Sequence, residues 1–238
     1  MPSFFITATD TDAGKTYISS MLLHVASLHN QKTLGFKPVA SGMEVLAGKN
    51  TNQDVELLKA ASTISIPHSA VNPYLFEQAI APHIAAVIEH QHIDLNVIKK
   101  QVDSYQHQAD FVLVEGVGGW EVPLNDTQGI PDLAKILAYP VIVVVKIKTG
   151  CINHAILTIN AIRQQGLEIA GWVANQVKDN DVARANISSI EDRTGLSCLA
   201  KIAESEPLSF LQQLDFLKNK GEPAKEIMQL YKRLLELN

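Results

Sequence analysis

The segment that most constrains the fold is a short apolar strand that runs into a loop of the phosphate-binding type. Residues 4–8 read Phe-Phe-Ile-Thr-Ala, and residues 9–16 read Thr-Asp-Thr-Asp-Ala-Gly-Lys-Thr before an apolar helical stretch begins. A bound phosphate needs backbone N–H groups at a helix N-terminus, a lysine and a hydroxyl that ligates magnesium. Gly14 with its neighbouring amides, Lys15 and Thr16 supply these groups. The strict motif has glycine at the first loop position, where this chain has threonine, but the placement between strand and helix favours a nucleotide site.

Further apolar segments predict a parallel sheet. Each is short and ends in a polar or glycine-rich turn, and stretches with helix-period apolar residues lie between them. The expected strands are 4–8, 33–37, 111–115, 141–145 and 169–174, and the expected helices are 16–29, 130–137, 153–165 and 182–193. Strands that are apolar throughout are buried on both faces, as a parallel sheet requires. We therefore expect an α/β fold over residues 1–238, a single-domain P-loop NTPase-like, mostly parallel sheet with helices on both faces.

Three stretches depart from this rhythm. Residues 41–53 hold two glycines and a polar run, and we expect a loop there before a short helix that begins near Asp54. Residues 62–92 hold three prolines and are expected to leave the sheet. The tail, residues 222–238, carries apolar residues at helical spacing, so we expect a helix that closes the fold rather than one that binds a partner.

The composition argues against several classes of function. The 238 residues carry a formal net charge of -5 and no long run of Lys or Arg, so nucleic acid is not an expected partner. The longest apolar run, residues 141–145, is far too short to span a bilayer, and the start lacks the features of a signal peptide. We therefore expect a cytoplasmic protein with no membrane contact. Cys151 and Cys198 are expected to be buried thiols rather than part of a disulfide framework or a zinc site.

Two later strands end in residues that suit nucleotide chemistry. Residues 111–115 end in Glu115 and are followed by Gly-Val-Gly-Gly-Trp, an arrangement of the Walker B type in which Glu115 is a candidate magnesium ligand. Lys37, at the end of the second strand, either neutralises a transferring γ-phosphoryl group or is a surface lysine. Asp54 is either a second metal carboxylate or a helix N-cap, and taken alone it favours the cap.

The phosphate loop also holds two carboxylates, Asp10 and Asp12. A carboxylate beside a triphosphate repels it unless a cation lies between them. These residues are therefore either turn and capping residues or contacts to a second substrate that carries positive charge, such as an amine.

Several blocks of the chain together resemble the dethiobiotin synthetase family. The resemblance covers residues 7–16, 35–42, 71–74, 81–84, 113–120, 150–155 and 170–175, in the family's order. The most specific blocks are Lys-Pro-Val-Ala-Ser-Gly at 37–42 and Gly-Cys-Ile-Asn-His-Ala at 150–155. The family usually has glycine where Ala8 stands and often glutamate where Asp12 stands, and of its Gly-x-Ile-Pro near residue 200 this chain keeps only Ile202.

The resemblance implies an ATP-dependent ligase of biotin biosynthesis. In this family 7,8-diaminopelargonate, CO2 and MgATP give dethiobiotin, ADP and phosphate. A carbamate forms on one amine, ATP phosphorylates it to a mixed anhydride, and the second amine closes the cyclic urea. The implied nucleotide-binding residues are Asp12, Ala13, Gly14, Lys15, Thr16, Tyr17, Asp54, Glu115, Gly116, Val117, Gly118 and Asn175, the last of which would read adenine.

The resemblance also implies the remaining roles. Catalysis would fall to Lys37, Lys15 and Thr11, the Mg2+ ligands would be Thr16, Asp54 and Glu115, and the carbamate and diamine would contact Thr11, Ser41 and Gly118. The helix start at Cys151, Ile152 and Asn153 would bind the substrate carboxylate across the interface of a homodimer, since its N–H groups and dipole attract an anion.

The alternative is a partition or septum-positioning type of P-loop ATPase, which uses nucleotide to switch dimerisation and partner binding. Such proteins share the fold but usually carry a signature lysine early in the loop, and residues 9–13 contain none. A basic amphipathic tail that would suggest a membrane target is also missing from the sequence. A third class, a glutamine-dependent amidoligase, would need an attached glutaminase domain, for which 238 residues leave no room.

Overall fold

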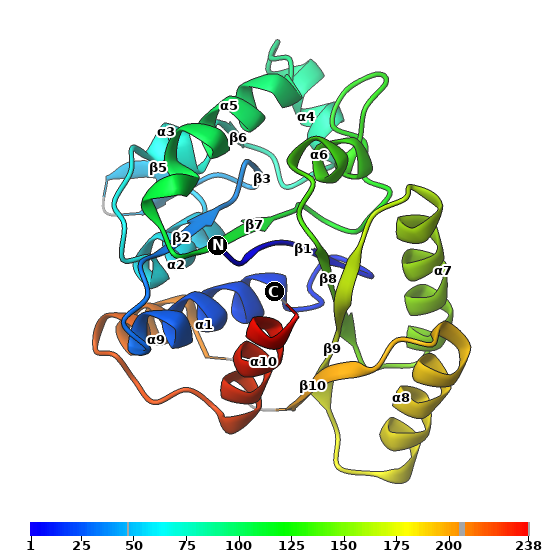
Figure 1. The fold of residues 1–238 in the computed structure, drawn as a ribbon. Helices are drawn as coiled ribbons and strands as arrows, with labels where there is room; N and C mark the ends of the chain where they lie inside the picture. The colour runs from blue at the N-terminus through cyan, green and yellow to red at the C-terminus, as the bar shows by residue number, and fades with distance from the viewer. Residues whose placement is uncertain (47, 205–207, 238) are drawn as a thin grey trace.

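The computed structural model describes residues 1–46, 48–204 and 208–237, and its centre is a six-stranded sheet (Figure 1). The strand order is β10-β9-β8-β1-β7-β2, and every neighbouring pair is parallel. The bounds are β1 (Ser3–Ala8), β2 (Thr33–Phe36), β7 (Phe111–Glu115), β8 (Val141–Lys146), β9 (Ile169–Val177) and β10 (Cys198–Ala203). The expected parallel sheet is confirmed, with β10 as a strand that the sequence pattern did not predict.

Helices cover both faces of this sheet. One face carries α1 (Lys15–Leu28), α2 (Gln53–Ala61), α9 (Phe210–Lys218) and α10 (Lys225–Glu236), which share one apolar core with it. The other face carries α5 (Leu95–Tyr105), α6 (Ile130–Leu137), α7 (Cys151–Gln164) and α8 (Asp181–Thr194). In Figure 1, α7 and α8 lie across β8 and β9 from α10. The tail thus forms the expected closing helix, and α10 packs against α1 and β10.

The side chains of β1 explain why these strands are apolar along their whole length. Phe4, Ile6 and Ala8 belong to the core on the α1 side, whereas Phe5 belongs to the core on the α6 and α7 side. Alternate side chains of a strand point to opposite faces, so helices on both faces bury both sets. Full burial of a side chain of the size of isoleucine or phenylalanine stabilises the fold by about 1.5–3 kcal/mol.

The chain between β2 and β7 departs most from the expectation. Residues 41–53, expected to form a loop, include an antiparallel hairpin of β4 (Glu44–Leu46) and β5 (Lys49–Thr51). Residues 62–92 leave the main sheet, as expected, but β6 (Tyr74–Phe76) pairs in parallel with β3 (Val39–Ser41). The helical elements of this part are α3 (His68–Val71), α4 (Pro82–Ile88) and, after α5, η1 (Gln106–Gln108). Short strands form only where a partner strand is available, so a local pattern gives little signal for them.

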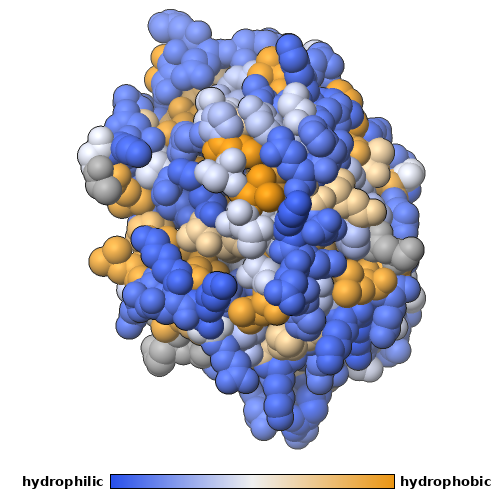
Figure 2. Space-filling model, turned by 60° about the vertical axis from the view of Figure 1, so that its left-hand side comes forward, coloured by the Kyte–Doolittle hydropathy of each residue, from blue (hydrophilic) through white to orange (hydrophobic). Residues whose placement is uncertain are grey.

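The surface agrees with the composition. Figure 2 shows a face that is mainly hydrophilic, with apolar side chains in small groups. In the part of the chain that the structure describes, no helix combines the length and the apolar character needed to cross a membrane. Cys151 and Cys198 are both buried and free, as expected.

Candidate active site

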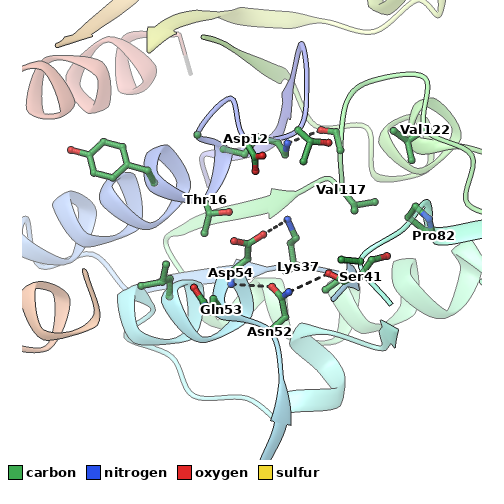
Figure 3. A pocket seen from close by; sticks show the side chains of 18 of the residues that line it. Asp12, Thr16, Lys37, Ser41, Asn52, Gln53, Asp54, Pro82, Val117 and Val122 are labelled. Atoms are coloured by element: carbon green, nitrogen blue, oxygen red, sulfur yellow. Dashed lines mark hydrogen bonds and ion pairs between the residues drawn. The ribbon is translucent and has the colours of Figure 1, made fainter. Parts of the chain in front are cut away.

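The carboxyl ends of β1, β7 and β2 bring three loops to one edge of the sheet. The strand register pairs Ile6 with Glu115 and Phe36 with Val114, so Lys37 leaves β2 next to Glu115. A cavity of about 840 Å³ opens at this edge, where ligands of open α/β sheets bind (Figure 3). Its lining residues are Thr11, Asp12, Gly14, Lys15, Thr16, Tyr17, Lys37, Ala40, Ser41, Asn52, Gln53, Asp54, Leu57, Ala79, Ile80, Ala81, Pro82, Val117, Gly118, Val122 and Gln213.

The loop after β1 has the backbone geometry of an anion site. Gly14 is the N-cap of α1 at a φ of +97°, and a Cβ there would lie 2.1 Å from Nδ2 of Asn175. Asn175 in β9 donates from Nδ2 to the carbonyl of Ala13 over 2.8 Å, which braces the loop from a strand two places away from β1 in the sheet. The first backbone N–H groups of α1 have no hydrogen-bond partner within the helix, and they lie at the cavity. The helix dipole favours negative charge at the same place.

Lys15 links this loop to the loop after β7. Its Nζ donates to the carbonyl of Gly118 over 2.6 Å. Burial, aided by the positive charge of Lys37, lowers the pKa of Lys15 to about 8. An anionic phosphate in the cavity would favour the charged amine and so oppose this shift.

Lys37 is the centre of an ionic cluster. It is 3% exposed, and its Nζ donates to Oε1 of Glu115 over 2.6 Å and lies 3.0 Å from Oδ2 of Asp54. Figure 3 shows Lys37 and Asp54 pointing toward each other in the middle of the site. Burial opposes the charge of Lys37, but the two carboxylates outweigh it and raise its pKa above the usual value. Lys37 is therefore a buried, charged lysine, which excludes the surface alternative.

Thr16, Asp54 and Glu115 form a donor set that suits a hard divalent cation. The Oγ1 of Thr16 donates to Oε1 of Glu115 over 2.7 Å, so the hydroxyl and both carboxylates surround one place. The second oxygen of Glu115, Oε2, is buried and has no hydrogen-bond partner in the described ranges. Mg2+ takes such oxygen ligands together with phosphate and water, and an unpaired buried oxygen is costly otherwise. The three residues therefore fit the ion. This set holds only two carboxylates beside the hydroxyl of Thr16. A metal site made of three or more His, Cys, Asp or Glu side chains is not found within the described residues.

The N-cap interpretation of Asp54 is wrong, because Asn52 caps α2. Asn52 accepts a hydrogen bond from the backbone N–H of Asp54 over 3.0 Å, which leaves the carboxylate of Asp54 in the first helical turn. Burial raises the pKa of Asp54, but the attraction of Lys37 outweighs it and lowers the pKa below the usual value. Asp54 is thus held as an anion beside Lys37.

The two loop carboxylates have different surroundings. Asp10 lies 3.0 Å from Nζ of Lys148, so its charge has a partner, and this contact lowers its pKa. Asp12 has a left-handed φ of +57° and lines the cavity. Of the two, Asp12 is the one that faces the space for a ligand.

The remaining residues expected at the site divide into two groups. Thr11, Ser41 and Gly118 line the same cavity as Lys15 and Lys37, and so do Tyr17 and Val117. The carbonyl of Gly116 accepts from Nζ of Lys37 over 3.2 Å. By contrast, Cys151, Ile152 and Asn153 begin α7 and are absent from the cavity lining.

The cavity also has an apolar wall that the sequence did not reveal. Ile80 comes from the segment between β6 and α4, Pro82 is the first residue of α4, and Val122 comes from the loop after β7. In Figure 3, Pro82, Val117 and Val122 lie across Lys37 from Thr16. Pro82 lies in the family block 81–84, but Ile80 and Val122 lie outside every such block, and only the packing of the loops brings the three together.

A parallel sheet, a lysine-bearing loop between β1 and α1, and a carboxylate at the end of β7 define a P-loop ATPase type of protein. The family model described as an AAA domain matches residues 2–211. An ATP-dependent dethiobiotin synthetase of Cellvibrio japonicus is 46% identical over 84% of this chain and 88% of its own length. That of Pseudoalteromonas translucida is 40% identical over 89% of this chain and 94% of its own length. The chain belongs to the dethiobiotin synthetase family, as its sequence blocks predict.

Solved structures of other P-loop ATPases share the fold. A ParA family ATPase from Chlorobium tepidum has a TM-score of 0.63 at 11% identity, covering 100% of this chain and 98% of that chain. The MinD cell division protein of Aquifex aeolicus has a TM-score of 0.61 at 16% identity, covering 99% and 98%. At such identities the likeness concerns the fold alone, so the sequence relatives favour the synthetase over the partition type of ATPase.

Proposed function

We propose that the protein is an ATP-dependent dethiobiotin synthetase that converts 7,8-diaminopelargonate, CO2 and ATP into dethiobiotin, ADP and phosphate. The observation that carries the proposal is one cavity that joins the P-loop lysine, Lys15, to the buried Lys37 and to an apolar wall. The protein also matches relatives that are named as this enzyme, over most of their length. The cavity thus offers a place for a triphosphate and for an aliphatic substrate side by side.

The chemistry begins on the substrate itself. A neutral amine attacks CO2 and loses a proton, which gives a carbamate. A carbamate oxygen then attacks the γ-phosphorus, and ADP leaves. The second amine attacks the carbonyl carbon of the mixed anhydride, phosphate leaves, and the urea ring closes with loss of a proton.

The protein contributes positioning and electrostatics to these steps. Lys15 and Lys37 would neutralise the oxygens of the transferring phosphoryl group, which is the main task in phosphoryl transfer. Lys37 suits this role because Glu115 and Asp54 keep its amine charged and fixed in place. Thr11 would stabilise the same oxygens through its hydroxyl.

Thr16, Asp54 and Glu115 would hold Mg2+ in this proposal. When bound, the ion would neutralise the β- and γ-phosphate oxygens. The orphaned Oε2 of Glu115 and the hydroxyl of Thr16 beside it support this assignment.

The diamine would lie between Ser41, Thr11 and Gly118, with its hydrocarbon chain along the apolar wall. The Oγ of Ser41 is buried and has no partner in the described part of the chain, so it offers a hydrogen bond to the carbamate or an amine. Asp12 supports the choice of a cationic substrate, because its carboxylate faces the cavity. Asn175 would read adenine through the amide oxygen that its contact to Ala13 leaves over.

The working unit in this proposal is a homodimer of two single P-loop domains in the cytoplasm. The substrate carboxylate would bind to the N-terminal amides of α7, at Cys151, Ile152 and Asn153, of a second copy. Since these residues do not line the cavity of their own chain, a neighbouring chain would have to supply them. Size-exclusion chromatography with light scattering tests the assembly, and a monomer at assay concentration would contradict it.

The decisive experiment measures ADP release by the purified protein with MgATP and bicarbonate, with and without 7,8-diaminopelargonate. We expect turnover that depends on the diamine, with dethiobiotin as the product. Turnover without the diamine, or none at all, would refute the proposed function. A nucleotide switch that acts through partner binding would give the first of these results.

A further inference from the structure

Lys37 sits where the main sheet no longer holds the backbone. β2 ends at Phe36, and the register of β2 with β7 ends at the pair Phe36 and Val114. Residue 38 is proline, which has no N–H group to donate. The backbone of Lys37 is therefore held by contacts from outside the main sheet, while Glu115 of β7 contacts its ammonium.

The segment that follows α3 supplies these contacts. The N–H of Lys37 donates to the carbonyl of Val71 over 3.0 Å. The side chain of Asn72 donates from Nδ2 to the carbonyl of Lys37 over 2.6 Å and to the carbonyl of Tyr74 over 3.1 Å. The N–H of Tyr74 in turn donates to the carbonyl of Pro38 over 3.1 Å. Lys37 is thus clamped on both its polar backbone groups.

The orientation of the Asn72 amide follows from its neighbours. Both groups at Nδ2 are carbonyls, which only accept, so the nitrogen and not the oxygen must face them. Oδ1 is buried and has no hydrogen-bond partner in the ranges that the structure describes, and the residue is 4% exposed. An unpaired buried amide oxygen lowers the free energy of unfolding, so the contribution of Asn72 to stability does not by itself explain an asparagine at this position. What the amide provides is a pair of donors, one of them to Lys37.

We propose that Asn72 is a positioning residue for catalysis, which holds the backbone of Lys37 so that its ammonium meets the transferring phosphoryl group. This inference rests on the proposed function, because it needs the reaction in which Lys37 acts. Asn72 does not line the cavity, so it acts through Lys37 and not by touching a substrate. In the described part of the chain its side chain donates only to the carbonyls of Lys37 and Tyr74, neither of which is in the P-loop, so nucleotide binding should survive its loss.

The test compares Asn72→Asp and Asn72→Leu with the wild-type enzyme. Asp keeps the shape but, as a carboxylate, cannot donate to either carbonyl, and Leu removes every polar atom. We expect kcat to fall by about 10- to 100-fold, the range that a misplacement of about 1 Å produces, while KM for ATP changes by less than about threefold. If both variants fail to fold, Asn72→Ser, which is smaller and cannot span to the carbonyl, replaces them.

Asn125 provides the matched control. Its Nδ2 donates to the carbonyl of Ile93 over 2.9 Å and to Oε1 of Gln128 over 3.1 Å, so it also bridges two segments, but away from the cavity. Asn125→Asp and Asn125→Leu should lower the melting temperature yet keep kcat within about twofold when corrected for the folded fraction.

The outcomes separate cleanly. A loss of kcat at Asn72 with an intact KM for ATP, and no such loss at Asn125, supports the positioning role. A kcat that stays within about twofold of wild type, or that falls only with the folded fraction, overturns it. If the wild-type protein itself shows no diamine-dependent turnover, the proposed function fails instead, and the two failures cannot be confused.

Discussion

Replacing Lys37 by methionine should destabilise the protein far more than a surface lysine substitution would. Methionine keeps an unbranched side chain only one atom shorter but removes the charge that faces Glu115, whose side chain is fully buried. Removing one partner of a buried ion pair costs about 3–5 kcal/mol, because the other charge stays buried and unpaired. For a chain of this size, about 2–4 °C per kcal/mol converts the loss into a fall in melting temperature of about 6–20 °C.

Thermal and urea unfolding followed by circular dichroism measure this effect. The control is Lys99→Met, since Lys99 pairs with Asp103 on the exposed face of α5. An exposed pair of this spacing contributes only about 0.3–0.5 kcal/mol. The double variant Lys37→Met/Glu115→Gln should recover part of the loss, because it removes the stranded charge as well. Equal stability of Lys37→Met and Lys99→Met would refute the reasoning that the cluster is buried and electrostatically coupled.

Three further predictions concern the nucleotide. Burial lowers the pKa of Lys15 to about 8, so ADP binding without added metal should weaken as the pH rises through that value and the amine loses its charge; calorimetry on Lys15→Arg, which stays charged, should show no such dependence. Gly14→Ala should lower nucleotide affinity at least about tenfold, because its Cβ would meet Asn175, while Gly195→Ala, at φ +65° with open space around it, leaves affinity unchanged in the same titration. Lys37→Ala should lower kcat far more than it raises the Kd for ATP, and equal losses in a turnover assay and a binding assay would mean a ground-state contact only.

The sequence predicted the sheet well where a strand is buried on both faces. β1, β7 and β8 are apolar along their length, and the local pattern alone marks them because helices cover both sides. β10 escaped prediction, since its exposed Lys201 interrupts the apolar run at an edge of the sheet. The hairpin at β4 and β5 is largely exposed, and its strands of three residues each are too short to show an alternating apolar pattern.

The candidate site divides in the same way. Gly14, Lys15 and Thr16 lie within a few residues, so their chemistry was legible as a motif. The sequence left two roles open for each of Lys37 and Asp54. Lys37 could equally have been a surface lysine, and Asp54 could have been a helix cap. The structure resolves both roles, because Nζ of Lys37 lies 3.0 Å from Oδ2 of Asp54 on a different part of the chain.

By itself, the sequence determined the P-loop, the parallel sheet and the family, because these depend on local pattern and on blocks of residues in a fixed order. Tertiary structure alone decided that Lys37 is buried and charged, that Asn52 and not Asp54 caps α2, and that Asn72 holds the backbone of Lys37. The physical reason is that burial, charge pairing and hydrogen-bond partners depend on which loops meet at the edge of the sheet. A local pattern of residues does not indicate which loops pack together.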